Sequence, residues 1–162
     1  MKDYIAELLG TFTLVFAITA TIVGTSDLAG GFGVINLLAV AFTAGLVLTV
    51  LIYAFGSISG GHFNPAVTIG LAFAKKFPKK KVAPYLAAQF AGGLLASLAL
   101  WIIVIDSSLG ATTAGSFGTT AALLMEIIAT AIFMVVILSV SGRKDAMSNA
   151  GLSVGFYLLV AH

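Results

Sequence analysis

The polar residues best placed to interact with a small molecule lie between residues 59 and 68, where the sequence is Ser-Gly-Gly-His-Phe-Asn-Pro-Ala-Val-Thr. Asn64 is a favourable N-cap residue, and Pro65 suits the first position of a helix. Gly60 and Gly61 permit a tight backbone path just before them. The pattern predicts a loop that runs into a short helix over residues 64–75. The unpaired amides at the start of such a helix are hydrogen-bond donors.

Chemical catalysis is not indicated by the sequence. It shows no pairing of a nucleophile with a base and no cluster of metal ligands, and it contains no cysteine. We therefore expect no enzyme activity, no cofactor, no metal ion and no disulfide. The basic residues are confined to the N-terminus and to segments between apolar stretches, so the small positive net charge does not indicate a nucleic-acid partner.

The composition is that of a polytopic membrane protein, and the lipid bilayer is its expected partner. Hydrophobic residues make up 60% of the chain and charged residues only 9%. A transmembrane helix needs roughly 20 mostly apolar residues. The stretches that meet or approach this length are residues 4–24, 34–57, 82–105, 119–141 and 148–162. The last stretch is short for a crossing.

The basic residues predict the orientation of these spans. They are Lys2, five lysines between residues 75 and 81, and the pair Arg143 and Lys144. The positive-inside rule places all of these on the cytoplasmic side, together with the N-terminus. The segment between the second and third spans must then begin and end at the cytoplasm. A helix over residues 65–75 would be roughly 16 Å long, about half of a hydrocarbon core of roughly 30 Å. We therefore predict a re-entrant half-helix.

A re-entrant loop requires a cavity, because non-helical backbone at membrane depth is tolerated only inside protein or against water. An internal repeat supports a channel or transporter architecture. Glu7 and Thr11 near the start of the first span are matched by Glu126 and Thr130 near the start of the fourth. Three spans separate the copies, so the repeat is inverted. We expect a single all-α transmembrane domain over residues 1–162, with a first repeat over 1–105 and a partial second repeat over 119–162.

Residues 58–68, taken with Ala-Glu-Leu-Leu-Gly-Thr at residues 6–11, closely resemble the major intrinsic protein family, the aquaporins and aquaglyceroporins. Gln89 and its neighbours and Glu126 with Thr130 also fit the family pattern. The resemblance implies six tilted helices, two half-helices that meet at the membrane centre, a pore in each subunit and a homotetramer. Five of the six expected spans are present in this sequence.

The resemblance implies roles for individual residues. The Asn-Pro-Ala box, Asn64, Pro65 and Ala66, would lie at the pore centre, with the Asn64 amide donating to a passing water molecule. The backbone carbonyls expected to line the pore are those of Gly60, Gly61, His62 and Phe63. The residues expected to brace the re-entrant loops are Glu7, Glu126 and Gln89. The His62 ring is expected to be packed in the loop.

The sequence departs from the family pattern in two ways. It lacks the second Asn-Pro-Ala box and the arginine that follows it, so we expect a C-terminally shortened chain that does not form a channel alone. The candidates for the narrow selectivity filter are Ala44, Leu158 and His162. A filter of Ala44 and Leu158 would be wider and less polar than a strict water filter, which favours glycerol, urea or small undissociated acids beside water.

The sequence thus predicts a passive channel in the plasma membrane that carries water and small neutral solutes and excludes protons and ions. Two alternatives stay open. Intramembrane carboxylates are functional by default, so Glu7 and Glu126 are also candidates for the carriers of a proton- or ion-coupled secondary transporter. The other alternative is a membrane scaffold that transports nothing.

Overall fold

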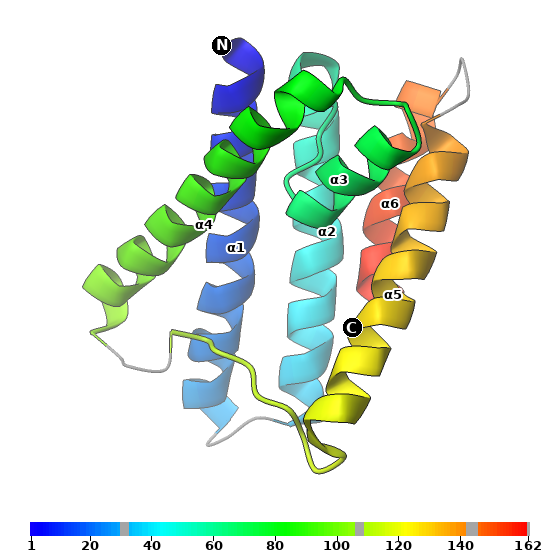
Figure 1. The fold of residues 1–162 in the computed structure, drawn as a ribbon. Coiled ribbons are helices and arrows are strands. Elements are labelled where there is room, and N and C mark those ends of the chain that lie inside the picture. Colours follow the sequence, from blue (N-terminus) through cyan, green and yellow to red (C-terminus); the bar gives the residue numbers. More distant parts are fainter. Residues whose placement is uncertain (30–32, 106–108, 142–145, 162) are drawn as a thin grey trace.

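The computed structural model describes residues 1–29, 33–105, 109–141 and 146–161, and in these residues the chain is entirely helical (Figure 1). The helices are α1 (Lys2–Ala29), α2 (Val34–Ser59), α3 (Pro65–Phe73), the short 3₁₀ helix η1 (Lys79–Lys81), α4 (Val82–Val104), α5 (Gly118–Val140) and α6 (Ala146–Ala161). The predicted all-α class is confirmed.

Within the described residues, α1, α2, α4 and α5 are long and apolar enough to cross a membrane. The apolar part of α6, Ala150–Ala161, is shorter, as the sequence predicted for the last span. Each of these four helices begins and ends within five residues of the boundaries predicted for its span. The chain is therefore an integral, polytopic membrane protein.

The short helix α3 lies between the longer ones and does not cross the bundle (Figure 1). The chain descends from the end of α2, turns, and climbs through α3 back to the same end, where α4 begins. At 9 residues, α3 is about 14 Å long, which is too short to span. The helix ends at Phe73, two residues before the predicted boundary, because Lys75 adopts a left-handed conformation with φ of 58°.

The apolar face of α3 is buried between helices from both halves of the chain. Val67 and Leu71 of α3 belong to one core cluster, which also takes in side chains of α2, α5 and α6. The members of this cluster from the other helices are Leu48, Leu51, Phe133, Ile137 and Val154. This packing fixes the depth and direction of the half-helix.

Glycine permits a close contact between the helices α1 and α4. A Cβ atom built on Gly92 would lie 3.0 Å from the backbone nitrogen of Phe12 and closer still to the carbonyl oxygen of Leu8. Backbone atoms cannot rotate out of the way as a side chain can. The neighbouring Gly93 is different, since a Cβ there would meet only Val15 Cγ2, at 4.0 Å.

We expect the variant Gly92→Ala to separate α1 from α4 and to destabilise the folded protein by about 1–3 kcal/mol. Gly93→Ala is the matched control, and it should be neutral or slightly stabilising because alanine favours a helix over glycine. Thermal unfolding of the two variants in detergent measures the difference. Equal melting temperatures would contradict the close contact at Gly92.

Candidate functional site

The carboxylate of Glu7 holds the turn that precedes α3. Its Oε1 accepts a hydrogen bond from the backbone nitrogen of His62 at 3.0 Å, and its Oε2 accepts one from that of Phe63 at 2.7 Å. The Glu7 side chain is fully buried. Hydrogen bonds to an ionised carboxylate are shorter and stronger than neutral ones. The two loop amides have no partner within a helix, and lipid offers them none. Glu7 therefore supplies their hydrogen-bond acceptors.

Gln89 of α4 extends this contact to α3. Its Nε2 donates to Glu7 Oε2 at 2.8 Å and to the hydroxyl of Thr68 at 2.9 Å. Its Oε1 is buried without a hydrogen-bond partner among the described residues. Rotating the amide would place Oε1 against the Glu7 carboxylate, which is worse than leaving it unpaired. The charge of Glu7 thus decides the orientation of Gln89.

The Thr68 hydroxyl joins three other groups in the same cluster. It donates to the carbonyl oxygen of Asn64 at 3.2 Å and accepts from Gln89, and it lies 3.0 Å from Nδ1 of His62. A hydroxyl has one proton and two lone pairs. Every contact is satisfied when neutral His62 carries its proton on Nδ1. The cluster fixes the imidazole ring in the interior, and the ring is 6% exposed.

Phe63 completes the turn in a conformation that costs energy. Its φ is 48°, a left-handed value that costs an L-residue about 1–2 kcal/mol. Its ring is 2% exposed and packs directly against Gly10 of α1. The tight packing of this ring against Gly10 holds the residue in that conformation. The contact between the Phe63 ring and Gly10 therefore packs the turn directly against α1.

Asn64 caps α3, as the sequence predicted. Its Oδ1 accepts a hydrogen bond from the backbone nitrogen of Ala66 at 2.8 Å, and Pro65 occupies the first helical position. The cap commits Oδ1 and leaves the two protons of the Nδ2 group without an acceptor among the described residues. In the same part of the chain, no hydrogen bond reaches the carbonyl oxygens of Gly60, Gly61, His62 or Phe63.

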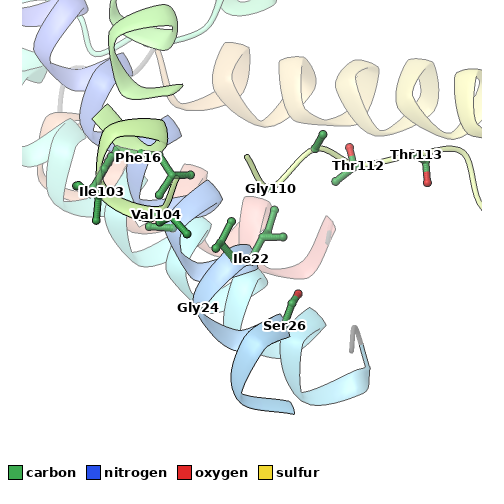
Figure 2. A pocket seen from close by; sticks show the side chains of 13 residues that line it. Phe16, Ile22, Gly24, Ser26, Ile103, Val104, Gly110, Thr112 and Thr113 are labelled. Carbon is green, nitrogen blue, oxygen red and sulfur yellow. The ribbon is translucent and has the colours of Figure 1, made fainter. Parts of the chain in front are cut away.

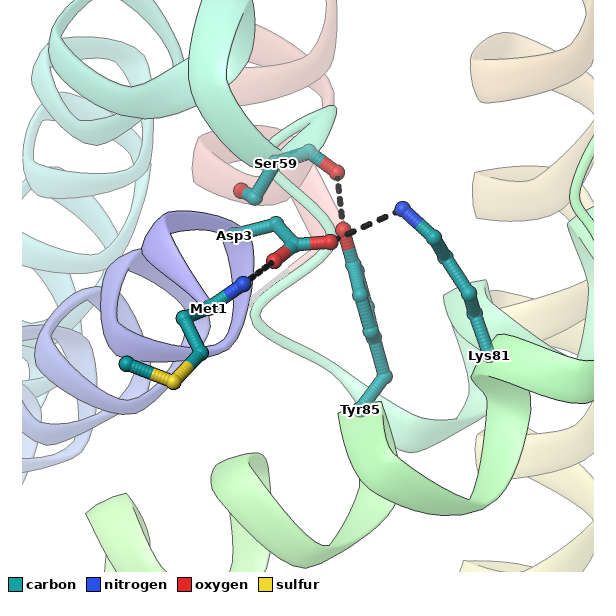
Figure 3. Close-up of polar contacts among 5 residues, drawn as sticks. All are labelled: Met1, Asp3, Ser59, Lys81 and Tyr85. Atoms are coloured by element: carbon teal, nitrogen blue, oxygen red, sulfur yellow. Dashed lines mark hydrogen bonds and ion pairs between the residues drawn. The ribbon is translucent and has the colours of Figure 1, made fainter.

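Polar contacts at the open end of the loop hold it to α4 and α1 (Figure 3). The Tyr85 hydroxyl donates to the carbonyl oxygen of Ser59 at 2.8 Å. Lys81 forms an ion pair with Asp3 at 2.9 Å. The Phe77 ring lies against those of His62 and Tyr85, with both centroid distances 4.7 Å.

A cavity of about 360 Å³ opens beside Asn64. Its walls come from the start of α3 and from α5 and α6. The lining residues are Asn64, Glu126, Ala129, Thr130, Phe133, Tyr157, Leu158 and Ala161. The phenol of Tyr157 stacks on Phe133 and donates to the carbonyl oxygen of Ala129 at 2.9 Å, and these two contacts join α6 to α5. A small polar molecule in the cavity would meet the Asn64 amide.

The structure treats the three filter candidates differently. Leu158 lines the cavity beside Asn64. Ala44 does not, because its side chain is 0% exposed. The reason is the close packing of α6 on α2, where a Cβ on the adjacent Gly45 would lie only 2.6 Å from Leu159 Cβ. Ala44 and Leu158 therefore do not line the same cavity in this structure. His162 lies outside the described residues.

Glu126 also differs from its predicted counterpart Glu7. The two carboxylates lie on helices that run in opposite directions (Figure 1). Glu126 is exposed on the cavity, and no loop amide binds it within the described part of the chain. Glu7 is fixed by hydrogen bonds from the turn and from α4, whereas the side chain of Glu126 is exposed on the cavity. A bracing contact at Glu126 is not present in this structure.

A larger cavity, of about 860 Å³, lies away from these residues (Figure 2). It lies between the C-terminal parts of α1 and α4, and residues 110–113 close one side of it. Its walls include Phe16, Ile103 and Val104 and are mainly apolar. It contains none of the residues that the sequence singled out, so size alone does not identify the site.

Two residues of the site had no role assigned from the sequence, Thr68 and Tyr85. Thr68 follows Asn64 by four residues, which places its hydroxyl one turn above the cap. That spacing was a usable signal. The contact of Tyr85 with Ser59 joins residues 26 positions apart in sequence, and no local pattern indicates it.

We expect Glu7→Gln to destabilise the protein by about 3 kcal/mol, because an amide donor would replace a carboxylate oxygen opposite a backbone N–H. Tyr85→Phe is the milder comparison, since it removes one neutral hydrogen bond worth about 1 kcal/mol. Thermal unfolding in detergent reports both. If Glu7→Gln unfolds at the wild-type temperature, the carboxylate does not hold the turn.

Comparisons with known proteins agree with this geometry. The sequence profile of the major intrinsic protein family matches residues 1–162. Aquaporin Z of Photorhabdus laumondii is 36% identical over 176 residues, a match that covers 99% of this chain and 74% of the relative. Glycerol uptake facilitator protein-like 6 of Lactiplantibacillus plantarum is 39% identical over 171 residues, with 99% and 76% covered.

A solved structure shares the fold. The aquaglyceroporin from Plasmodium falciparum superposes with a TM-score of 0.79 at 28% identity, and the match covers 98% of this chain and 70% of that one. Sequence profile, relatives and structure therefore agree over nearly the whole chain. The chain belongs to the major intrinsic protein family.

Proposed function

We propose that this chain forms the wall of a passive pore for water and small neutral solutes that excludes protons and ions. The observation that carries the proposal is that a free donor and free acceptors lie close together at the start of the half-helix. The donor is the Nδ2 group of Asn64, and the acceptors are the backbone carbonyls of the turn before it. Donors at the centre and acceptors beside them allow a neutral molecule to exchange partners at little desolvation cost. Glycerol, urea and undissociated acids are candidate solutes beside water.

The half-helix also supplies the exclusion of cations. The N-terminus of α3 carries unpaired amides and the positive end of the helix dipole. This end begins at Pro65, beside the cavity that Asn64 lines. A positive potential at that point repels cations and hydronium ions. The same amides are favourable partners for the oxygen of water or of an alcohol.

The transporter alternative has less support. Glu7, its main candidate carrier, already accepts hydrogen bonds from two backbone amides and from Gln89. Protonation would sacrifice these bonds, which is costly for a buried network. A group with that role braces the loop and does not exchange protons readily. The accessible carboxylate, Glu126, lies on the cavity without a comparable partner among the described residues.

Several finer features belong to the same proposal. The pore would include Leu158 as an apolar filter residue, and Glu126 would brace a second re-entrant loop of the full-length protein. Residues 1–105 and 119–162 would be the two inverted repeats. The assembly would be a homotetramer in the plasma membrane with a cytoplasmic N-terminus, which the basic residues of the loops support.

Osmotic swelling of liposomes that contain the full-length protein tests the function. We expect fast water entry with a low activation energy and no proton current, and glycerol entry that is faster than in empty liposomes. Solute uptake that follows an imposed proton gradient would support a coupled transporter. Liposomes that swell no faster than empty ones would support the scaffold.

The variant Asn64→Asp tests the electrostatic part of the proposal. We expect it to raise proton or cation leak about tenfold, because a change of about 1.4 kcal/mol in a barrier alters a rate by that factor. Asn64→Ser is the matched control, since serine caps a helix without adding charge. Proton leak is measured with a pH-sensitive dye inside the liposomes. An unchanged leak in an intact Asn64→Asp pore would refute the electrostatic account.

A further inference from the structure

The segment that links α3 to α4 carries five lysines between residues 75 and 81, and two of them are held by protein groups. Lys76 Nζ donates to the carbonyl oxygen of Leu138 at 2.8 Å and to the hydroxyl of Ser141 at 3.2 Å. A cation at this position also complements the negative end of the α5 dipole. Lys81 is paired with Asp3 at the start of α1. These two lysines tie the segment to helices on either side.

The segment is also fixed from within the bundle. The Phe77 ring packs against His62 of the re-entrant turn and Tyr85 of α4. Anchors at residues 76, 77 and 81 leave little conformational freedom between them. A ligand that binds here would not have to order a loose loop, which removes a large part of the usual cost of binding.

The other three lysines, Lys75, Lys79 and Lys80, are exposed and form no ion pair within the described residues. They lie within six residues of one another in the sequence. Lys75 has a left-handed backbone with φ of 58°, a conformation that glycine adopts without strain.

We infer that Lys75, Lys79 and Lys80 form a binding surface for the phosphate groups of anionic phospholipids. The segment joins the end of α3 to α4, a membrane-spanning helix, so it lies at the level of the lipid headgroups. Its unpaired charge is positive throughout, and Asp3, the acidic residue that contacts it, is already neutralised by Lys81. Clusters of lysine at this level attract acidic lipids.

Native mass spectrometry of the full-length protein tests this inference by titration with dioleoylphosphatidylglycerol and, in parallel, with dioleoylphosphatidylcholine. We expect the wild-type protein to retain phosphatidylglycerol preferentially. In the variant K79Q/K80Q, the ratio of retained phosphatidylglycerol to retained phosphatidylcholine should fall about tenfold or more. In K79R/K80R this ratio should stay at the wild-type value. Equal retention of the two lipids by the wild-type protein, or an unchanged preference in K79Q/K80Q, would overturn the inference.

The variant R143Q/K144Q removes two charges from the other basic segment and is the matched control. We expect it to retain phosphatidylglycerol as the wild-type protein does. An equal loss in both double variants would mean that net charge matters and that no defined surface exists. Inorganic phosphate added at the same concentration should not displace the lipid. Displacement would identify a site for free anions and overturn the assignment to lipid.

Lys75→Gly separates a binding role from a structural one. Glycine relieves the left-handed backbone, so a purely structural role predicts equal or higher thermal stability and unchanged lipid retention. The proposed surface predicts equal or higher stability with weaker retention of phosphatidylglycerol. Retention equal to that of the wild-type protein would remove Lys75 from the surface.

Discussion

The carboxylate of Glu7 is the group on which the rest of this structure depends. A turn of non-helical backbone inside the membrane presents N–H groups that lipid cannot satisfy, and Glu7 accepts those of His62 and Phe63. The same carboxylate orients Gln89, which binds Thr68 of α3. One charge therefore joins α1, the turn, α3 and α4. Without it, the turn that precedes Asn64 would lose its hydrogen bonds to α1.

The sequence predicted the parts of the fold that rest on short-range physics. Length and charge required the chain to return to its starting side after α2, and Asn64 with Pro65 marked the start of α3. Both were confirmed. The end of α3 was placed two residues too late because Lys75 takes a conformation usually reserved for glycine. A lysine gives no sequence signal for such a turn.

The parts that sequence could not predict depend on packing between distant segments. The position of Ala44 along α2 fits a filter residue. The packing of α6, more than one hundred residues later in the chain, buries it. Glu7 and Glu126 occupy equivalent places in the predicted repeat, yet Glu7 is bound by the turn and α4, whereas Glu126 borders a cavity. Symmetry of sequence does not ensure symmetry of environment. The contact of Tyr85 with Ser59 is likewise invisible to any local pattern.

The distance in sequence between Glu7 and its partners has a consequence for synthesis. The partner amides lie 55 and 56 residues further along the chain, and Gln89 lies 82 residues further. When α1 first leaves the ribosome, the Glu7 carboxylate near its start has none of these partners, and an unpaired carboxylate within a membrane-spanning segment is unfavourable. The hydrogen bonds to Glu7 are therefore complete only after Gln89 of α4 has been synthesised. Stable insertion of α1 therefore depends on residues as far along the chain as Gln89.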